Sequence, residues 1–351
     1  MSNHLIVNNP GLHTTLQDLG RVGYLNNGVP PSGAVDPINL RLANALVGNK
    51  QNEGCLEILY GGAEFSVGAD TVQIALCGED SFLEVLDPEK IEIANGRSVT
   101  LERGDRFRVV LGLKSPSAYL AVSGGFDVQP VMGSVSTYVR GEFGGFSGRP
   151  LRKGDELPLR KGEIEEVRNV AFGKKLPPIT DPDEVCTIRI VLGPQEQFLT
   201  ETGTSTLLND TFVYSRNADR MGIRLDGPTL GLQGHEGFVS DGIIAGAIQV
   251  PGSGQPIILM ADHQTSGGYP KVATVISADL PILGRLRPQR AIRFEAVSVN
   301  EAQQYAKDLE AELKKIIGSI NPIEAASKLD VEKLYTENLL SGVVSIQNDD
   351  D

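Results

Sequence analysis

The stretch Gly242–Leu286 reads GIIAGAIQVPGSGQPIILMADHQTSGGYPKVATVISADLPILGRL and sets the expectation for the fold. It contains three short apolar, β-branched runs, at Ile243–Val250, Ile257–Met260 and Val272–Ile276, separated by turns that carry glycine and proline. Runs of this length with this punctuation are typical of β-strands. Between the second and third runs lies the polar insert Ala261–Lys271. A polar loop carried by rigid strands is a usual place for a binding site, so this insert is the first candidate.

Length and composition indicate a soluble protein rich in turns. The chain has 351 residues, of which 40% are hydrophobic and 22% charged, and this fits two compact domains. Its 40 glycines and 20 prolines favour many short strands joined by tight turns. The net charge of −13 argues against nucleic acid or an anionic membrane as the main partner. Because no apolar stretch is long enough to cross a bilayer, we expect a cytoplasmic protein.

Neither the cysteines nor the histidines have the spacing of a metal site. Cys55, Cys77 and Cys186 include no C-x-x-C pair, and Cys77 lies in an apolar run where a buried thiol is expected. The four histidines include no H-x-x-x-H or H-E-x-x-H pair. The sequence therefore predicts neither a metal centre nor a disulfide framework.

The order of elements predicts two β domains followed by a helical end. Strand-like runs fill most of the first half, and Asp36-Pro37 begins its clearest helix, because aspartate caps and proline fits the first helical position. The proline-rich segment 177–182 is the expected linker, and Asn300 is the expected cap of an amphipathic helix that reaches Ile317. The predicted units are residues 1–180, residues 185–299, and a C-terminal helix and tail, residues 300–351.

One turn pattern recurs along the chain. Leu101–Asp105 and Leu151–Asp155 share it, and Leu286–Arg290 is a degenerate third copy; each precedes an apolar residue that starts a strand. A turn repeated late in each half indicates two related β-rich domains.

Two other polar segments are further candidates for a site. Residues 131–150 form a glycine-rich insert with Ser136 and Arg140, and so long an irregular segment is usually functional or mobile. It has no phosphate-loop motif. Residues 215–224 hold three arginines and an aspartate, which favours either a carboxylate or phosphate clamp or a solvated loop with internal ion pairs. The insert 261–271 could likewise be a hairpin loop whose polar side chains bond the local backbone.

Several segments, in one order, resemble a known family. They are Thr14–Arg21, Gly28–Ala34 with Asp36-Pro37, Leu40–Asn44, Glu57 with Gly61-Gly62, Ser215-Arg216 with Asp219–Gly222, Gly246–Pro251 and Asp262–Pro270. In them the chain is similar to the biotin-dependent carboxyltransferase, or allophanate hydrolase subunit 2, family. The Arg-Pro-Gly-Asp turn of that family is Arg287-Pro-Gln-Arg290 here, which we interpret as a tolerated surface turn. The resemblance implies a mainly β fold of two cyclophilin-like β-barrel domains, with a few helices and a C-terminal helical extension.

The resemblance also implies an activity that depends on partners. Members of the family include a subunit of bacterial 5-oxoprolinase, which opens the lactam of 5-oxoproline to L-glutamate with hydrolysis of ATP. We therefore expect a subunit of an ATP-dependent 5-oxoprolinase, an amide hydrolase active as a hetero-oligomer. Its expected partners are a subunit 1 relative of the KipI type and a lactam-utilisation-type subunit, with ATP used at the level of the complex.

Two alternatives stay open. The chain could be the carboxyltransferase component of a biotin-dependent urea or amide carboxylase, with biotin carried on another chain. It could also be a non-catalytic regulator of the KipA type that binds a KipI-like partner.

The resemblance and the residue types together assign a role to each candidate residue of the site. Catalysis and proton transfer are assigned to Asp262, His263 and Lys271, although neighbours on a strand point to opposite faces and need not cooperate. A cationic clamp for a carboxylate and donors for an amide oxygen are the groups that substrate binding needs. The residues assigned to substrate binding are Ser136, Arg140, Arg216, Arg220, Gln264, Gly267, Gly268 and Tyr269.

Overall fold

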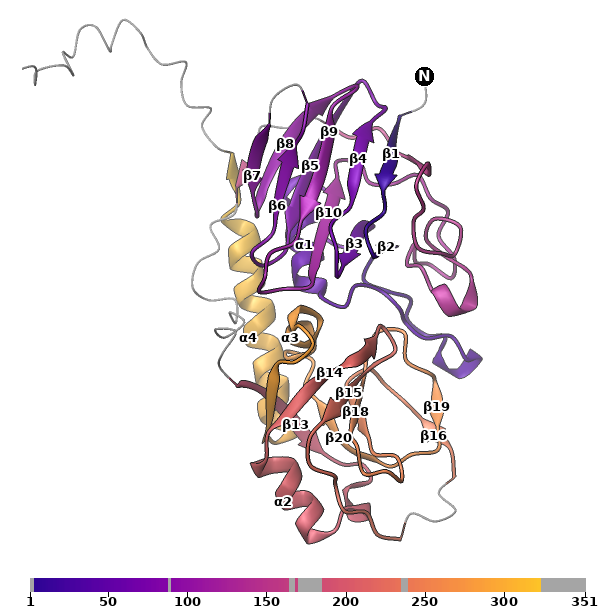
Figure 1. Cartoon of the computed structure of the whole chain (residues 1–351), viewed down its shortest axis with the longest axis vertical. Coiled ribbons are helices and arrows are strands. Elements are labelled where there is room, and N and C mark those ends of the chain that lie inside the picture. Colours follow the sequence, from indigo (N-terminus) through magenta and orange to yellow (C-terminus); the bar gives the residue numbers. More distant parts are fainter. Residues whose placement is uncertain (1–2, 88–89, 164–167, 170–184, 235–238, 323–351) are drawn as a thin grey trace, which may run out of the picture.

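The computed structural model describes residues 3–87, 90–163, 168–169, 185–234 and 239–322. The expected linker at residues 177–182 and most of the tail lie outside the described residues. The protein is mainly β with a few helices, as the sequence predicts. Figure 1 shows the strands of the first half above those of the second, with the long helix α4 (Val299–Gly318) running along one side of both. Among the described residues, no helix is long and apolar enough to cross a membrane.

The first half consists of two facing sheets. One sheet has the strand order β11 (Glu156–Pro158), β1 (His4–Asn9), β4 (Glu64–Val67), β9 (Arg106–Val110), β6 (Phe82–Val85), β7 (Ile91–Ala94). The other has the order β2 (His13–Gln17), β3 (Cys55–Leu59), β10 (Ser117–Val122), β5 (Thr71–Cys77), β8 (Arg97–Glu102), β12 (Arg168–Asn169), β22 (Asn321–Pro322). Apolar side chains from both sheets form one buried cluster between them, in which the rings of Phe65 and Phe107 stack at 5.5 Å.

The second half is a closed barrel of seven strands. Its order is β13 (Cys186–Leu192), β20 (Lys271–Val275), β17 (Ala247–Gln249), β18 (Ile257–Leu259), β15 (Gly222–Asp226), β14 (Phe212–Asp219), β21 (Ala291–Ala296). The pair β13–β21 is parallel and closes the ring. The three apolar runs of the stretch Gly242–Leu286 supply β17, β18 and β20, so their prediction as strands is confirmed. The closed ring that the resemblance implied for both halves is found in this one, whereas the first half keeps two separate sheets.

Several short elements lie outside the main sheets and the barrel. A two-stranded flap, β16 (Asp241–Gly242) with β19 (Ser266–Gly267), lies outside the barrel. Helix α2 (Glu201–Asn209) packs near β21, and the described residues also contain the 3₁₀ turns η1 (Leu25–Asn27), η2 (Val139–Gly141) and η3 (Glu196–Phe198). All three cysteines are buried and free, and this confirms the expectation for Cys77.

Helix α1 (Pro37–Leu46) begins where the sequence predicts. The Asp36 carboxylate accepts hydrogen bonds from the N–H groups of Ile38 and Asn39, and Pro37 occupies the first helical position. The helix is buried over most of its surface because it packs on the second sheet on one side and on α4 on another. It thus anchors the face of that sheet which meets the second half.

The three turns predicted from the repeated pattern have the same geometry. Gly104, Gly154 and Gln289 all adopt positive φ angles, of +95°, +88° and +76°. Each N–H donates to a carbonyl on the neighbouring strand, at 2.9, 2.8 and 2.6 Å. The turns lead into β9, β11 and β21. The repeat is therefore structural in all three copies, and glutamine occupies a left-handed position in the third.

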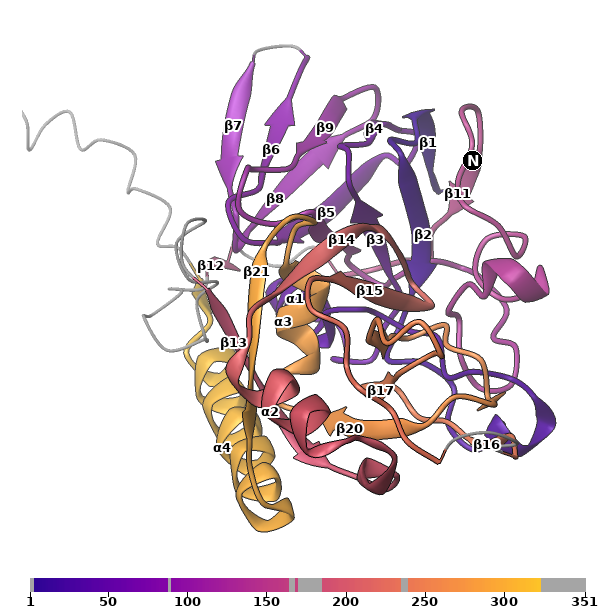
Figure 2. The same ribbon diagram turned by 60° about the horizontal axis from the view of Figure 1, so that its bottom comes forward.

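Two helices connect the halves. The short helix α3 (Leu280–Arg285) packs against the first half so closely that a Cβ on Gly284 would lie 2.4 Å from the carbonyl oxygen of Val35. Helix α4 begins with a capping box made by Ser298 and Glu301, so the cap lies two residues before the expected Asn300. Figure 2 shows α4 beside the barrel. The same helix also packs against α1.

Candidate functional site

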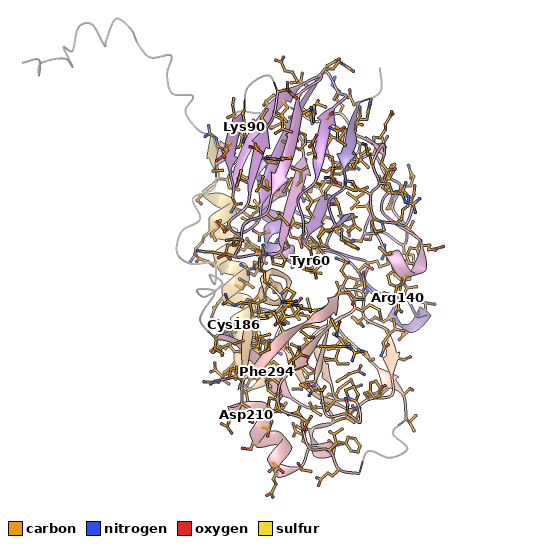
Figure 3. The ribbon with its side chains drawn as sticks, in the orientation of Figure 1. Tyr60, Lys90, Arg140, Cys186, Asp210 and Phe294 are labelled. Carbon is orange, nitrogen blue, oxygen red and sulfur yellow. The ribbon has the colours of Figure 1, made fainter. Side chains whose placement is uncertain are left out.

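The two halves meet along a buried polar boundary, here called the seam. One side of the seam is formed by the neighbouring strands β2, β3 and β10. On one face of these strands Thr15, Glu57 and Tyr119 lie next to one another in register. The other side is the start of the polar insert after β18, near Asp262. In Figure 3, Tyr60 and Arg140 mark the boundary between the halves.

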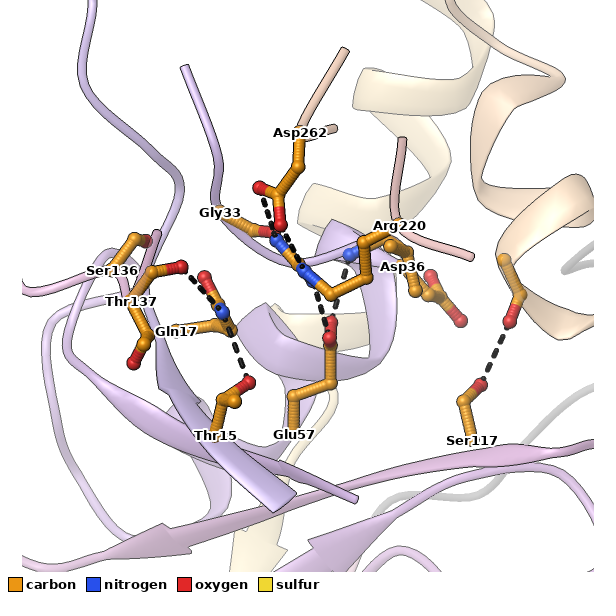
Figure 4. Close-up of polar contacts among 12 residues, drawn as sticks. Thr15, Gln17, Gly33, Asp36, Glu57, Ser117, Ser136, Thr137, Arg220 and Asp262 are labelled. Carbon is orange, nitrogen blue, oxygen red and sulfur yellow. Dashed lines mark hydrogen bonds and ion pairs between the residues drawn. The ribbon is translucent and has the colours of Figure 1, made fainter. Parts of the chain in front are cut away.

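Arg220 is at the centre of the seam. Its guanidinium pairs with Glu57 of the first half and, at 2.9 and 3.0 Å, with Asp262 of the second; a further N–H donates to the carbonyl of Gly33 at 2.7 Å. Figure 4 shows this arrangement. Burial opposes the charge of Arg220, but the carboxylates of Glu57 and Asp262 raise its pKa above the usual value. Arg220, assigned to substrate binding, and Asp262, assigned to catalysis, are thus brought together in a structural ion pair.

Glu57 extends this network into the first half. Its second carboxylate oxygen accepts the Tyr119 hydroxyl at 2.7 Å and the N–H of Val35 at 2.9 Å. Each charged side chain in the network contacts one of opposite charge and makes further hydrogen bonds. The free-energy cost of burying the network is therefore largely offset. The network fixes the second half against the first.

His263 is fully buried next to Asp262 but faces a different partner. Its Nδ1 lies 2.7 Å from the carbonyl oxygen of Gln264. A carbonyl can only accept, so Nδ1 carries the proton, and in the neutral imidazole Nε2 is then an unprotonated acceptor. Burial lowers the pKa of His263 below its usual 6.5, which keeps the ring neutral at pH 7. Within the described residues, Nε2 has no hydrogen-bond partner, and it is the one unengaged base among the residues assigned to catalysis.

Asp18 fixes the glycine-rich insert to the end of β2. Its carboxylate accepts hydrogen bonds from the hydroxyls of Ser134 and Ser136, at 2.6 and 2.5 Å, and from two backbone N–H groups. Ser136, assigned to substrate binding, is fully buried in this network. Its hydroxyl also accepts from the N–H of Asp18 at 3.0 Å. The structure therefore uses Ser136 to hold the insert.

An open cavity of about 460 Å³ lies on the outer face of the barrel, and we call it the barrel pocket. Ile223 and Ile258 pair in register and point into the barrel core, so their neighbours Arg224 and Ile257 point outward into the pocket. The lining combines charged, amide and apolar side chains: Arg216, Asn217, Ala218, Asp219, Met221, Gly222, Arg224, Gln249, Ile257, Leu259, Gln264 and Tyr269.

The barrel pocket brings together two segments that the sequence predicted separately. Arg216 comes from the arginine-rich segment, and Gln264 and Tyr269 come from the polar insert; all three were assigned to substrate binding. Arg216 lies in a bulge where three residues of β14 stand opposite Arg224 alone. A bulge redirects side chains away from the regular strand alternation, and here it turns Arg216 into the pocket.

The pocket carries unneutralised positive charge. Arg216 and Arg224 are exposed and, within the described part of the chain, make no ion pair. The Asp219 carboxylate at the same wall instead accepts the N–H groups of Met221 and Gly222, at 2.8 and 3.3 Å. Of the arginines in this segment, Arg220 alone is ion-paired, and its partners lie in the seam. The arrangement suits a carboxylate or another small anion.

The remaining assigned residues form the rim and support of the pocket. Arg140, on η2 of the first half, reaches the sulfur of Met221 at 2.7 Å. Lys271 is bonded through Nζ to Asp241 at 2.5 Å and to the carbonyl of Gly242 at 2.6 Å, so it holds the flap to the barrel. A Cβ on Gly267 would lie 2.8 Å from the amide nitrogen of Gln264. Gly268 adjoins Ser240 next to the flap.

Sequence reasoning missed several residues of the pocket. Gln249 is a buried polar residue within an otherwise apolar run, and that contrast was the available signal. Arg224 is the last of the three arginines in the segment 215–224 but was given no role, because the direction of its side chain depends on the strand register. Met221 and Leu259 look like ordinary core residues in sequence. In the described residues, no group of three or more His, Cys, Asp or Glu side chains is placed to hold a metal ion.

The chain belongs to the carboxyltransferase family: the family description "Carboxyltransferase domain, subdomain A and B" matches residues 27–296. It is 34% identical over 303 residues to the 5-oxoprolinase subunit designated C of Escherichia coli (strain K12), covering 85% of this chain and 93% of the relative. It is 35% identical over 302 residues to the corresponding 5-oxoprolinase subunit of Haemophilus influenzae, covering 86% and 94%. The crystal structure of K. lactis urea amidolyase is similar with a TM-score of 0.82 and 29% identity, over 90% of this chain and 20% of that one.

Proposed function

We propose that this chain is the carboxyltransferase-family subunit of an ATP-dependent 5-oxoprolinase. The two 5-oxoprolinase subunits of E. coli and H. influenzae are matched over nearly their whole length, 93% and 94%. The reaction adds one water across the lactam C–N bond of 5-oxoproline to give L-glutamate. A second water hydrolyses ATP to ADP and phosphate.

The observation that carries the proposal is the positive charge of the barrel pocket. 5-Oxoproline has a carboxylate and a lactam amide. Arg216 and Arg224, which make no ion pair with any described residue, offer guanidinium groups for the carboxylate. The amide side chains of Gln249 and Gln264 can donate to the lactam oxygen and accept from its N–H. Tyr269 and Arg140 lie at the rim, where they limit the shape of the ligand.

His263 is the proposed proton acceptor because its Nε2 is unprotonated and unengaged. Asp262 acts by holding Arg220, and so places His263 at the end of a fixed loop. Lys271 acts by holding the flap through Asp241. In this proposal both are positioning residues for the pocket.

The activity requires partner subunits in this proposal. They are a KipI-like subunit 1 relative and a lactam-utilisation-type subunit, and ATP is bound at the level of the complex in the cytoplasm. Arg140 and Met221 place the rim at the boundary of the two halves, where a partner could complete the site.

The test is glutamate release from 5-oxoproline and ATP by the complex purified with its genomic neighbours. We expect activity that disappears when this chain is omitted, and that falls for Arg216→Met while Arg152→Met, at an exposed arginine outside the pocket, keeps it. Activity that persists without this chain would contradict the proposal.

A second candidate is carboxyl transfer from carboxybiotin on another chain to a urea-like amide. The similarity to K. lactis urea amidolyase over 90% of this chain favours it. Carboxylation of urea by the complex, without lactam opening, would select it. Absence of both reactions, with tight binding to the KipI-like partner alone, would select the regulator.

A further inference from the structure

Four neighbouring strands of the barrel present their outer faces to the barrel pocket in a fixed lateral order. Gln249 of β17 pairs in register with Ile257 of β18, and Ile257 pairs with Arg224 of β15. Arg224 in turn stands opposite the bulge of β14 that carries Arg216. All four side chains line the pocket, and neighbouring strands lie about 4.8 Å apart. The wall of the pocket therefore runs from an amide through an apolar residue to two guanidinium groups.

The amide end of this row is a pair of carboxamides. Gln249 is 2% exposed, and its Nε2 donates to the carbonyl of Tyr269 at 3.4 Å. A Cβ on Gly267 would lie 2.9 Å from this nitrogen and 2.8 Å from Nε2 of Gln264, so the two amides converge beside Gly267. Each Nε2 has two hydrogens, and one hydrogen of Gln249 stays available after the contact with Tyr269. This end of the pocket can therefore donate to a carbonyl oxygen of a ligand.

The middle of the row is apolar, although it lies outside the barrel core. Ile257 packs with Ile243, Ala247 and Leu259 in a small cluster separate from the core. Leu259 stands in register with Gly222, which has no side chain. A Cβ on Gly222 would lie 3.3 Å from Cγ2 of Ile257 and 3.5 Å from Cδ2 of Leu259. Glycine at this position therefore leaves room in the pocket for a hydrocarbon group against both apolar side chains.

The order of groups along the row matches the order of groups around a saturated lactam. In 5-oxoproline, two ring methylenes separate the lactam carbonyl from the carbon that bears the carboxylate. When the carbonyl binds at Gln249 and the carboxylate binds at Arg224, the methylenes face Ile257, which lies between these two residues in the row. Urea has no hydrocarbon group to place there.

We infer that Ile257, together with Leu259 and the bare backbone of Gly222, determines specificity by selecting a saturated lactam over a urea. The choice of a lactam rests on the proposed function. A cyclic urea places an N–H where the lactam has a methylene. Against Ile257 that N–H loses its hydrogen bond to water and gains no acceptor, whereas a methylene has no such cost. The apolar contact thus distinguishes two ligands of nearly equal shape.

The test is calorimetric titration of the complex, purified with its genomic neighbours, in the absence of ATP. The ligands are 5-oxoproline and its cyclic-urea isostere, in which an N–H group replaces the ring methylene next to the carbonyl. We expect the wild type to bind 5-oxoproline about tenfold more tightly than the isostere. The matched variants are Ile257→Val and Ile257→Thr, whose new side chains have the same branched shape. Ile257→Val should keep the preference, and Ile257→Thr should abolish it because the threonine hydroxyl accepts from the N–H.

The inference would be overturned by equal affinities of the wild type for the two ligands, by no binding of either ligand, or by the same preference in both variants. If Ile257→Thr does not fold, Gly222→Ala places a methyl group in the space beside Ile257 and should weaken 5-oxoproline binding about tenfold. Unchanged affinity in that variant would overturn the inference equally. The proposed function fails separately: the complex would show the preference for 5-oxoproline and yet release no glutamate from it.

Discussion

Arg220 of the barrel and Glu57 of the first half form an ion pair in which the two side chains are 6% and 0% exposed. They are 163 positions apart in the chain. Asp262 completes the network from the same side as Arg220, so the barrel half carries its own ion pair while Glu57 depends on the barrel for its cation. An isolated first half would leave the Glu57 carboxylate without an opposite charge.

Arg220→Met is expected to destabilise the protein by about 3–5 kcal/mol, because Glu57 and Asp262 would remain buried without a cation. Urea unfolding followed by circular dichroism measures this. The matched control is Arg103→Met, which removes the ion pair between Arg103 and Asp70, with side chains 41% and 83% exposed. That change should stay within about 1 kcal/mol. Equal effects of the two variants would contradict a central role for Arg220.

Stability is expected to fall as the pH drops below 6.5. Burial lowers the pKa of both His263 and His13 below 6.5 in the folded state. The unfolded chain therefore takes up protons first, and protonation favours unfolding; above pH 6.5 this contribution is constant. His263→Asn, which keeps a donor for the Gln264 carbonyl, should flatten the slope of unfolding free energy between pH 6.5 and 5. A slope identical to that of the wild type would mean that His263 does not titrate in this window.

Gln289→Gly is expected to stabilise the protein by roughly 0.5–1 kcal/mol. Gln289 has a φ of +76°, where a side chain is strained and glycine is not. The reciprocal change, Gly104→Ala, places a side chain at a φ of +95° in open space and should destabilise by about the same amount. Thermal unfolding of the two variants tests the pair. Shifts of the same sign would show that the two turns are not equivalent.

Arg224→Met is expected to lower kcat/KM for 5-oxoproline about 10- to 100-fold in the complex, with little change in melting temperature. Arg224 is exposed and, among the described residues, has no ion pair to lose. A hydrogen-bonded charge contact is worth about 1.5–3 kcal/mol. Arg293→Met, on the exposed side of β21, is the control. Loss of activity that followed only from loss of folding would remove Arg224 from the site.

The sequence predicted what depends on local pattern. Asp36 was identified as a cap because its side chain and the following proline act on adjacent residues. The turn at Gln289 was recognised because it repeats a spacing, although its glycine is absent. The cap of α4 was placed at Asn300 instead of Ser298, since both residues can cap and the capping box with Glu301 decides between them.

The candidate site was predicted by residue type but not by role. Arg216 and Arg220 are four positions apart and looked equivalent. The bulge in β14 turns Arg216 into the pocket, whereas Arg220 forms an ion pair with Glu57 across the seam. Both outcomes depend on register and on contacts between distant segments, which a single sequence does not display.

Helix α4 has a consequence for the order in which the protein can fold during synthesis. It is translated after the whole barrel, yet Leu313 and Ile316 are buried against α1, and β22 pairs with β12 of the first half. The hydrophobic cluster around α1 therefore stays incomplete while the ribosome makes the second half. Chains released before α4 would present that apolar surface to solvent, so premature termination produces a species that chaperones and proteases can recognise.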